Sequence, residues 1–207
     1  LATFIHPEFL TSLPNSELLS GLAEMLKHAL ISSSGEWMKL LQILGAELPK
    51  DQLIKALSDT GALQASIDIK TNVVAQDPHE TGVRKILNFG HTVGHAIESA
   101  ALEHNALPHG YCVLWGMVAE VYLSVVKLGC LREVLQRLTQ IMLQYYGRPQ
   151  CNCKQREQLI QRMYQDKKNS ANRTPNFTLL RAVGEPEINQ YVSEKDIDEA
   201  LEYLFSL

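Results

Sequence analysis

The chain has 207 residues, of which 45% are hydrophobic and 20% are charged, and its formal net charge at pH 7 is −4. This apolar share excludes a disordered protein, and the length suffices for one domain or two small ones with a buried core. The negative charge argues against nucleic acid as the main partner, because phosphate binding needs clustered Lys and Arg residues.

The first half of the chain has the periodicity of helices, with apolar residues recurring every three or four positions. Four helices are expected over residues 14–31, 35–44, 50–59 and 60–76. The last of these ends at Asp77, because a residue before proline, here Pro78, avoids the helical region. A fifth helix is expected over residues 81–104, with Thr81 as its N-cap.

The second half continues this pattern and adds a short β element. Helices are expected over residues 109–129, 131–147, 156–168 and 193–207. Gly129 ends the first of them, and Ser193 with Asp196 forms a capping motif at the start of the last. Residues 176–183 and 185–192 are expected to pair as a hairpin. The sequence therefore predicts one mainly α-helical domain over residues 1–207, with a small β-hairpin near the C-terminus.

The most apolar stretch, residues 111–126, is too short to span a bilayer and contains Glu120, so we expect a buried helix and no membrane association. The first ten residues show neither a basic segment nor a long apolar core, so no signal peptide is visible. The first residue is Leu1 and not Met, which indicates a fragment or a processed product.

The cysteines form no C-x-x-C pair. They are Cys112, Cys130, Cys151 and Cys153. This usage favours a reducing, cytoplasmic location, and the Cys151-x-Cys153 pair is interpreted as two incidental thiols. The sequence also contains no G-x-G-x-x-G turn, no G-x-x-x-x-G-K-[ST] loop and no G-x-S-x-G elbow. No nucleotide cradle is therefore predicted within this chain.

One polar stripe stands out in the expected helix over residues 81–104. At about 100° of rotation per residue, its members fall within roughly 80° of one another. They are Arg84, Asn88, His91, His95 and Glu98. The other positions are apolar or small, so the helix is buried and the stripe faces a polar network or a cavity. Gly90 and Gly94 beside it indicate close approach of either another backbone or a ligand.

The stripe offers metal-binding chemistry. His91 and His95 are spaced i, i+4, which allows two imidazoles to bind one metal ion, and His109 begins the next helix. Two histidines and a glutamate suit Zn²⁺ and leave a position open for substrate. Glu24 and Lys27, with Ser20 on the same face, have the spacing of an exposed i, i+3 ion pair.

Cations and an amide complete the candidate site. Lys70, Arg84 and the pair Lys167/Lys168 suit carboxylate or phosphate groups, and Asn88 suits a hydroxyl. The residues alone therefore predict a metal-assisted enzyme that acts on a small, anionic, polyhydroxylated molecule.

The segment ILNFGHTVGHAIE resembles the 3-dehydroquinate synthase family of sugar-phosphate cyclases. The likeness extends to the segments before it (SLPNSELLSGLAEMLKHALI and Lys70 to Arg84) and after it (His109 to Met117 and Gln165-DKK-Asn169). The resemblance implies an NAD- and zinc-dependent lyase, with Co²⁺ as a substitute metal. Such an enzyme converts the phosphorylated sugar acid 3-deoxy-D-arabino-heptulosonate 7-phosphate to 3-dehydroquinate and phosphate in the shikimate pathway.

The resemblance also assigns roles. The metal ligands would be Glu24, His91 and His109, and His95 would act near the substrate in proton transfer and phosphate binding. Glu80 would be a supporting or proton-relay group. Substrate would contact the residues Lys27, Lys70, Arg84, Asn88, His95 and Lys167, with Lys168 as the alternative to the last. Lys27 is expected to take part in catalysis as well.

The resemblance further implies a homodimer, in which an N-terminal, Rossmann-like domain outside this chain binds NAD. The chain alone would then be inactive. The sequence departs from the family pattern at Tyr111 and Cys112, and in the loop from Asp77 to Glu80, which bears on loop shape and touches no proposed ligand.

Other interpretations stay open. Another sugar-phosphate cyclase, such as 2-deoxy-scyllo-inosose synthase, would share the fold and the zinc site, although Arg84 beside Lys70 favours a carboxylated substrate. An iron-dependent alcohol dehydrogenase relative fits the Glu24-x-x-Lys27 motif poorly. A non-catalytic helical interaction domain would use the stripe only as a buried hydrogen-bond network.

Overall fold

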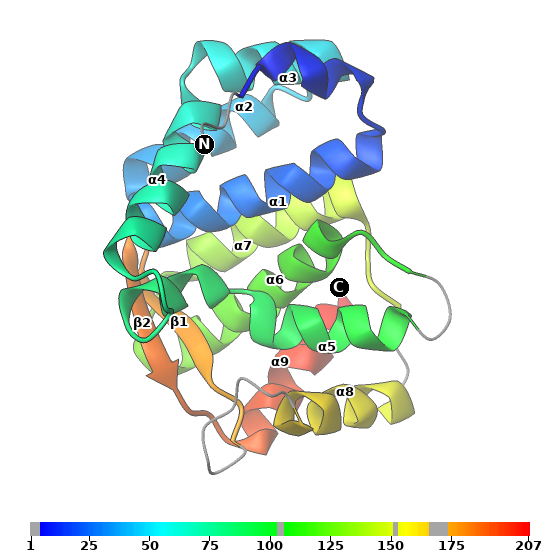
Figure 1. Cartoon of the computed structure of the whole chain (residues 1–207). Coiled ribbons are helices and arrows are strands. Elements are labelled where there is room, and N and C mark those ends of the chain that lie inside the picture. Colours follow the sequence, from blue (N-terminus) through cyan, green and yellow to red (C-terminus); the bar gives the residue numbers. More distant parts are fainter. Residues whose placement is uncertain (1–4, 103–105, 151–152, 166–173) are drawn as a thin grey trace.

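The helices of the N-terminal half lie where the apolar periodicity predicts them (Figure 1). The computed structural model describes residues 5–102, 106–150, 153–165 and 174–207. Its first elements are the 3₁₀ turn η1 (Pro7–Ser12) and the helices α1 (Asn15–Ser32), α2 (Ser34–Gly45), α3 (Lys50–Asp59) and α4 (Ala62–Gln76). Of these, only η1 was not predicted from the sequence.

The prediction of a single helix over residues 81–104 is wrong. The segment forms a 3₁₀ turn, η2 (Val83–Asn88), and a separate helix, α5 (His91–Ala101). Asp77, and not Thr81, organises its start, because the Asp77 carboxylate accepts backbone N–H groups of Thr81, Gly82 and Arg84 at 2.8–3.1 Å. The break lies at Gly90, whose φ of 79° is left-handed and incompatible with a continuous helix.

The C-terminal half contains the long helix α6 and the β-hairpin. Its elements are α6 (His109–Leu128), α7 (Arg132–Ile141), the π turn η3 (Met142–Tyr146), α8 (Cys153–Gln165), β1 (Phe177–Ala182), β2 (Glu185–Gln190) and α9 (Glu194–Ser206). Gly129 ends α6 with a φ of 73°, and the predicted capping box of Ser193 and Asp196 is present. The helix expected to run to residue 147 instead changes to the π turn in its last residues.

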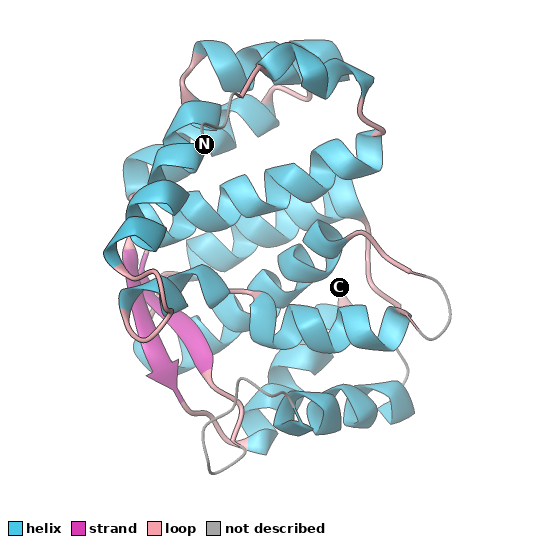
Figure 2. Cartoon of the chain, viewed as in Figure 1, coloured by secondary structure: helices cyan, strands magenta, loops and turns pink. Residues whose placement is uncertain are grey.

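Helices α1 and α6 form the centre of the molecule (Figures 1 and 2). Helices α2 and α4 pack against α1, whereas α5, α9 and strand β1 pack against α6. Hydrogen bonds fix the antiparallel hairpin to the helices around it, from Thr178 Oγ1 to the Lys85 carbonyl, from the Leu180 N–H to Ser124 Oγ and from the Gly184 N–H to the Leu30 carbonyl. The mainly α-helical fold with a β-hairpin is thereby confirmed.

Helix α6 has 20 residues and is long and apolar enough to cross a membrane, so the predicted shortness of this stretch is wrong. However, 67% of its most apolar window is buried inside the protein, as expected for a core helix. Cys112 and Cys130 are buried free thiols, and Cys151 lies outside the described residues.

Candidate functional site

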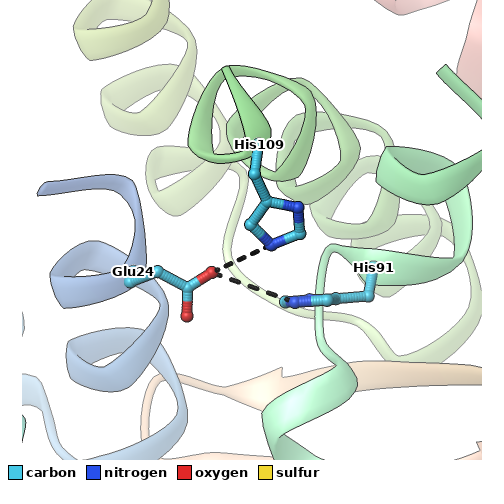
Figure 3. A group of neighbouring side chains, drawn as sticks. All are labelled: Glu24, His91 and His109. Carbon is cyan, nitrogen blue, oxygen red and sulfur yellow. Dashed lines mark ion pairs between the residues drawn. The ribbon is translucent and has the colours of Figure 1, made fainter. Parts of the chain in front are cut away.

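Three potential metal ligands from three helices point toward one another (Figure 3). Glu24 comes from α1, His91 is the first residue of α5, and His109 is the first residue of α6. Glu24 Oε1 lies 3.9 Å from His91 Nε2 and 3.7 Å from His109 Nε2, and the three ligand atoms all lie within 4.8 Å of one another. Ligand atoms bound to one tetrahedral zinc ion at 2.0–2.2 Å lie roughly 3.4 Å apart, so these atoms are close to the required spacing.

Hydrogen bonds on the far side of each imidazole fix which nitrogen faces Glu24. His91 Nδ1 lies 3.1 Å from the Phe89 carbonyl oxygen, and His109 Nδ1 lies 3.1 Å from Glu98 Oε2. A carbonyl or carboxylate oxygen only accepts, so each Nδ1 carries the proton. In the neutral rings, both Nε2 atoms therefore present a lone pair to Glu24.

The charges at this point also favour a bound cation. Burial lowers the pKa of His91 to about 3, and the nearby Lys27 ammonium adds to this shift, so the ring is neutral near pH 7. Burial raises the pKa of Glu24, but the charge and hydrogen bond of Lys27, together with smaller contributions from His91 and His28, outweigh this and the net shift is downward. Glu24 Oε1 is buried and has no hydrogen-bond partner among the described residues. A buried carboxylate oxygen facing two nitrogen lone pairs lacks a positive charge between them, which a divalent cation would supply.

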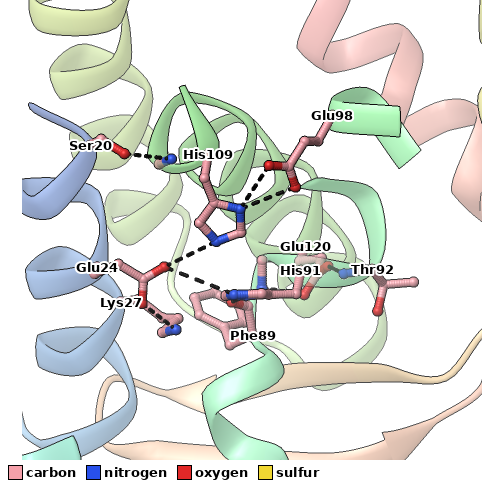
Figure 4. Close-up of polar contacts among 11 residues, drawn as sticks. Ser20, Glu24, Lys27, Phe89, His91, Thr92, Glu98, His109 and Glu120 are labelled. Carbon is pink, nitrogen blue, oxygen red and sulfur yellow. Dashed lines mark hydrogen bonds and ion pairs between the residues drawn. The ribbon is translucent and has the colours of Figure 1, made fainter. Parts of the chain in front are cut away.

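A glycine allows His109 to come close to Glu24. The Gly110 N–H donates to Ser20 Oγ at 2.9 Å, which joins the start of α6 to α1 (Figure 4). A Cβ atom on Gly110 would lie 2.2 Å from the Ser20 carbonyl oxygen, so only glycine permits this approach. The spacing of Ser20 with Glu24 and Lys27 did not suggest this contact, and the role of Gly110 was missed.

Glycines also allow the backbones of α5 and α6 to approach closely. A Cβ atom on Gly116 would lie 2.1 Å from the Gly90 carbonyl oxygen, and one on Gly94 would lie 3.0 Å from the Cys112 carbonyl oxygen. Of the two explanations for Gly90 and Gly94, backbone packing is therefore the one the structure supports. This packing fixes the distance between His91 and His109.

Glu120 of α6 is completely buried. Its side chain lies at the start of α5, close to His91 and Thr92 (Figure 4). Its Oε2 accepts the Gly90 N–H at 2.7 Å, and its Oε1 accepts the N–H groups of Thr92 and Val93 at 3.1 and 3.3 Å. Burial raises the pKa of this carboxyl to about 8, and the three N–H donors act in the opposite direction. The sequence suggested Glu120 only as a sign against a membrane helix, and no local motif links it to residues 90–93.

A cavity of about 430 Å³ opens beside the three candidate ligands. It is lined by Glu24, Lys27, His28, Lys70, Glu80, Arg84, Leu87, Asn88, His91, His95 and His109. All the catalytic, substrate-binding and metal-binding residues named from the sequence line this cavity, except Lys167. Small-molecule sites commonly have this size.

The sequence of residues 21–169 matches the family described as 3-dehydroquinate synthase C-terminal. The chain belongs to this family. A 3-dehydroquinate synthase of Parabacteroides distasonis is 37% identical over 98% of the chain and 56% of its own length, and one of Listeria monocytogenes is 35% identical over 95% and 52%. The chain thus spans about half the length of the curated relatives it matches.

Two synthases of known structure share the fold. A 2-epi-5-epi-valiolone synthase from Streptomyces hygroscopicus, solved with NAD⁺ and Zn²⁺ bound, aligns with a TM-score of 0.76 at 23% identity, over 98% of this chain and 55% of its own. A 2-deoxy-scyllo-inosose synthase, solved with carbaglucose-6-phosphate, NAD⁺ and Co²⁺, aligns with a TM-score of 0.72 at 18% identity, over 95% and 55%. At these identities the likeness concerns the fold alone.

Within this synthase-family site, Lys27 corrects one prediction. It is not part of an exposed ion pair, because its side chain is only 4% exposed and donates to Glu24 Oε2 at 2.6 Å. Among the other residues that line the cavity, Asn88 Nδ2 donates to Glu80 Oε1 at 2.6 Å, and Arg84 Nη1 donates to the Pro78 carbonyl at 2.8 Å. Lys70 is exposed at the cavity.

His95 lies in the cavity but not with the first ligand set. Its ligand atom groups with those of Glu98 and His109, while His91 groups with Glu24 and His109. The geometry thus differs from the simple His91–His95 pair that the spacing suggested. His28, which the sequence did not single out, is buried, and its Nδ1 lies 2.8 Å from Ser66 Oγ. Lys167 and Lys168 lie outside the described residues.

Proposed function

We propose that this chain is the metal- and substrate-binding part of a 3-dehydroquinate synthase. The full enzyme would convert 3-deoxy-D-arabino-heptulosonate 7-phosphate to 3-dehydroquinate and phosphate. The observation that carries the proposal is the buried, unpartnered Glu24 Oε1 facing two imidazole lone pairs at the wall of a cavity of suitable size. Membership of the family supports it.

In this proposal Glu24, His91 and His109 would hold Zn²⁺, or Co²⁺ as a substitute. When bound, the ion would supply a Lewis acid that polarises a substrate carbonyl and lowers the pKa of a hydroxyl. Three protein ligands would leave a coordination position open for substrate. A purely structural hydrogen-bond network is disfavoured, because it would leave the buried Glu24 Oε1 without a donor.

The cavity walls would bind an anion. Lys27, Lys70 and Arg84 bring three positive charges, whereas Glu24 and Glu80 bring two negative ones. A divalent cation would raise the excess positive charge further, which favours a substrate with carboxylate and phosphate groups. Arg84 and Lys70 on one cavity support the carboxylated substrate over the carboxylate-free substrate of an inosose synthase.

The remaining polar residues would position and move protons. Asn88, already oriented by Glu80, would hold a substrate hydroxyl. His95 lines the same cavity with its ring 5.1 Å from that of His91, and it would accept or donate a proton near the phosphate group of the substrate. The Lys27 ammonium would neutralise the charge of Glu24 and also contact the substrate in the cavity. Lys167 would add a further positive charge.

The rest of the enzyme would bind NAD. We infer an N-terminal domain with a Rossmann-like fold, since the chain spans about half the length of its relatives and its sequence has no dinucleotide-binding turn. A cytoplasmic homodimer belongs to the same proposal.

The direct test is product analysis with the full-length protein, NAD and Zn²⁺. We expect phosphate release and 3-dehydroquinate from the carboxylated heptulosonate phosphate, and no turnover of glucose 6-phosphate. Replacement of Arg84 by Met should raise KM for the sugar acid by about tenfold or more, corresponding to loss of one charge-assisted contact. Turnover of glucose 6-phosphate, without turnover of the sugar acid, would assign the chain to another cyclase.

A further inference from the structure

Helix α5 begins without a cap of its own. Its N-cap residue is Gly90, which makes no side-chain cap hydrogen bond. No larger residue fits there, because the φ of 79° is left-handed and a Cβ atom would lie 2.4 Å from Met117 Cγ. The first N–H groups of α5, next to His91, therefore need an acceptor from elsewhere.

Glu120 of α6 supplies that acceptor. Its two carboxylate oxygens accept the N–H groups of Gly90, Thr92 and Val93, which are the N-cap, second and third positions of α5. A side-chain oxygen at the N-cap would normally bind the second or third N–H. Glu120 thus replaces the missing N-cap side chain from 30 residues away in the sequence.

Glu120 is buried, and burying a carboxyl group costs free energy unless its oxygens are hydrogen-bonded. The residue is 0% exposed, so its carboxyl group has no access to solvent. Its two oxygens instead accept three N–H groups at the positive end of the α5 dipole. On the same helix, the Ser124 hydroxyl donates to the Glu120 carbonyl and accepts the Leu180 N–H, so this part of α6 is also fixed to strand β1.

We propose that Glu120 is a positioning residue for the metal centre: it locks the first turn of α5 to α6 and so sets His91 against Glu24 and His109. This inference rests on the proposed function, because it gives the metal site as the reason for the buried carboxylate. Replacement of Glu120 by Gln would keep the shape but present two N–H donors to backbone N–H groups, so the first turn would shift. Ligand position governs metal affinity, and loss of a supporting group costs about 10–100-fold.

The matched control is Ser124→Ala. Ser124 is also 0% exposed, lies one turn from Glu120 on the same helix face, and is hydrogen-bonded to β1 and not to α5. Both variants should lower the thermal unfolding temperature. Only Glu120→Gln should weaken zinc affinity by tenfold or more, and only this variant should shift the visible absorption bands of bound Co²⁺.

The experiment is a zinc competition titration and a Co²⁺ absorption spectrum of both variants in the full-length protein. Equal zinc affinities and superimposable spectra for a folded Glu120→Gln protein and the unmodified protein would overturn the inference. Failure of the unmodified protein to bind either metal would instead overturn the proposed function, and the inference with it.

If Glu120→Gln does not fold, amide hydrogen exchange in the unmodified protein decides. Zinc should then slow exchange at the Gly90, Thr92 and Val93 amides, because His91 and this turn would be held as one unit. Unchanged exchange at all three amides would overturn the inference.

Discussion

The three candidate ligands are oriented by hydrogen bonds with residues outside the ligand set. Glu98 holds His109 Nδ1, the Phe89 carbonyl holds His91 Nδ1, and Lys27 holds Glu24 Oε2. Each contact leaves one lone pair free to point at the shared centre. Among these partners Glu98 is a carboxylate, which also increases the basicity of the imidazole it orients.

Two substitutions of Glu98 should therefore reduce zinc affinity to different extents. Glu98→Gln keeps an oxygen that accepts the His109 proton but removes the charge, whereas Glu98→Ala removes both. We expect zinc affinity to fall by about 10–100-fold in the alanine variant and by less in the glutamine variant. The control is Glu133→Gln on the exposed side of α7, which should bind zinc as the unmodified protein does. Normal zinc affinity in Glu98→Ala would show that His109 needs no such support.

Asp77 links the conformation of a loop to pH. The backbone N–H of Gly82 lowers its pKa to about 2, and contacts from Thr81 and Arg84 contribute in the same direction. The folded-state pKa is below the unfolded value of 3.8, so Asp77 stabilises the fold above about pH 4, and this stabilisation is lost as the pH falls through 2. The difference in unfolding free energy between the unmodified protein and Asp77→Asn should therefore be largest at neutral pH and decrease steadily between pH 4 and pH 2. A constant difference across denaturant titrations from pH 7 to 2 would contradict this.

At the scale of the helices, the site depends on close backbone contacts among α1, α5 and α6. Gly110 allows the approach of α6 to α1, and Gly90, Gly94 and Gly116 allow that of α5 to α6. The three helices would separate if any of these glycines gained a side chain, and the ligands would separate with them.

Two glycine-to-alanine substitutions should have opposite effects. Gly116→Ala would place a Cβ atom 2.1 Å from the Gly90 carbonyl oxygen and should destabilise the protein by about 3 kcal/mol, with weaker zinc binding. Gly21→Ala is the matched control, because a Cβ atom there has no neighbour within 4 Å on helix α1. It should stabilise the protein by about 0.5–1 kcal/mol. Thermal unfolding of both variants tests this, and equal effects would show that the α5–α6 approach is not limited by Gly116.

The sequence predicted most elements because their signals are local. Periodicity located α1 to α4 and α6, and Ser193 with Asp196 located the start of α9. The break at Gly90 was missed, because it depends on Glu120 and Met117, which are distant in sequence. Arg84 and Asn88 nevertheless reached the predicted cavity, since the 3₁₀ turn and α5 present them to the same side.

The site residues, too, could be predicted from sequence spacing only where they lie on one helix. The spacing of His91 and His95 on one helix could not show that Glu24 and His109 come closer to His91 from other helices. That set came from the family resemblance, and the structure brings its members together. The roles of Glu98 and Glu120 need contacts between helices, which no spacing rule contains.

At the scale of the whole molecule, the candidate ligands join helices from opposite parts of the chain. Glu24 belongs to α1, which packs with α2 and α4, and His91 belongs to α5, which packs with α6 and α8. A metal ion bound to Glu24, His91 and His109 would therefore connect both sides of the fold. Binding only to the folded protein stabilises it according to the free metal concentration.

Zinc removal should lower the stability of the entire fold. With free zinc at 100 times its dissociation constant, the gain is about 2.7 kcal/mol, which corresponds to roughly 5–10 °C in the unfolding temperature of a chain of this size. A chelator should remove this gain, and added zinc should restore it. A His91→Ala variant should show neither response in calorimetry. An unfolding temperature that does not depend on zinc in the unmodified protein would contradict the account.

The most direct test of the metal centre is zinc content and affinity in three histidine variants of the full-length protein. The account predicts one zinc ion per chain in the unmodified protein, its loss in His91→Ala and in His109→Ala, and its retention in His95→Ala. Retention of zinc in His109→Ala together with its loss in His95→Ala would contradict the account, because the His91–His95 pair would then form the site.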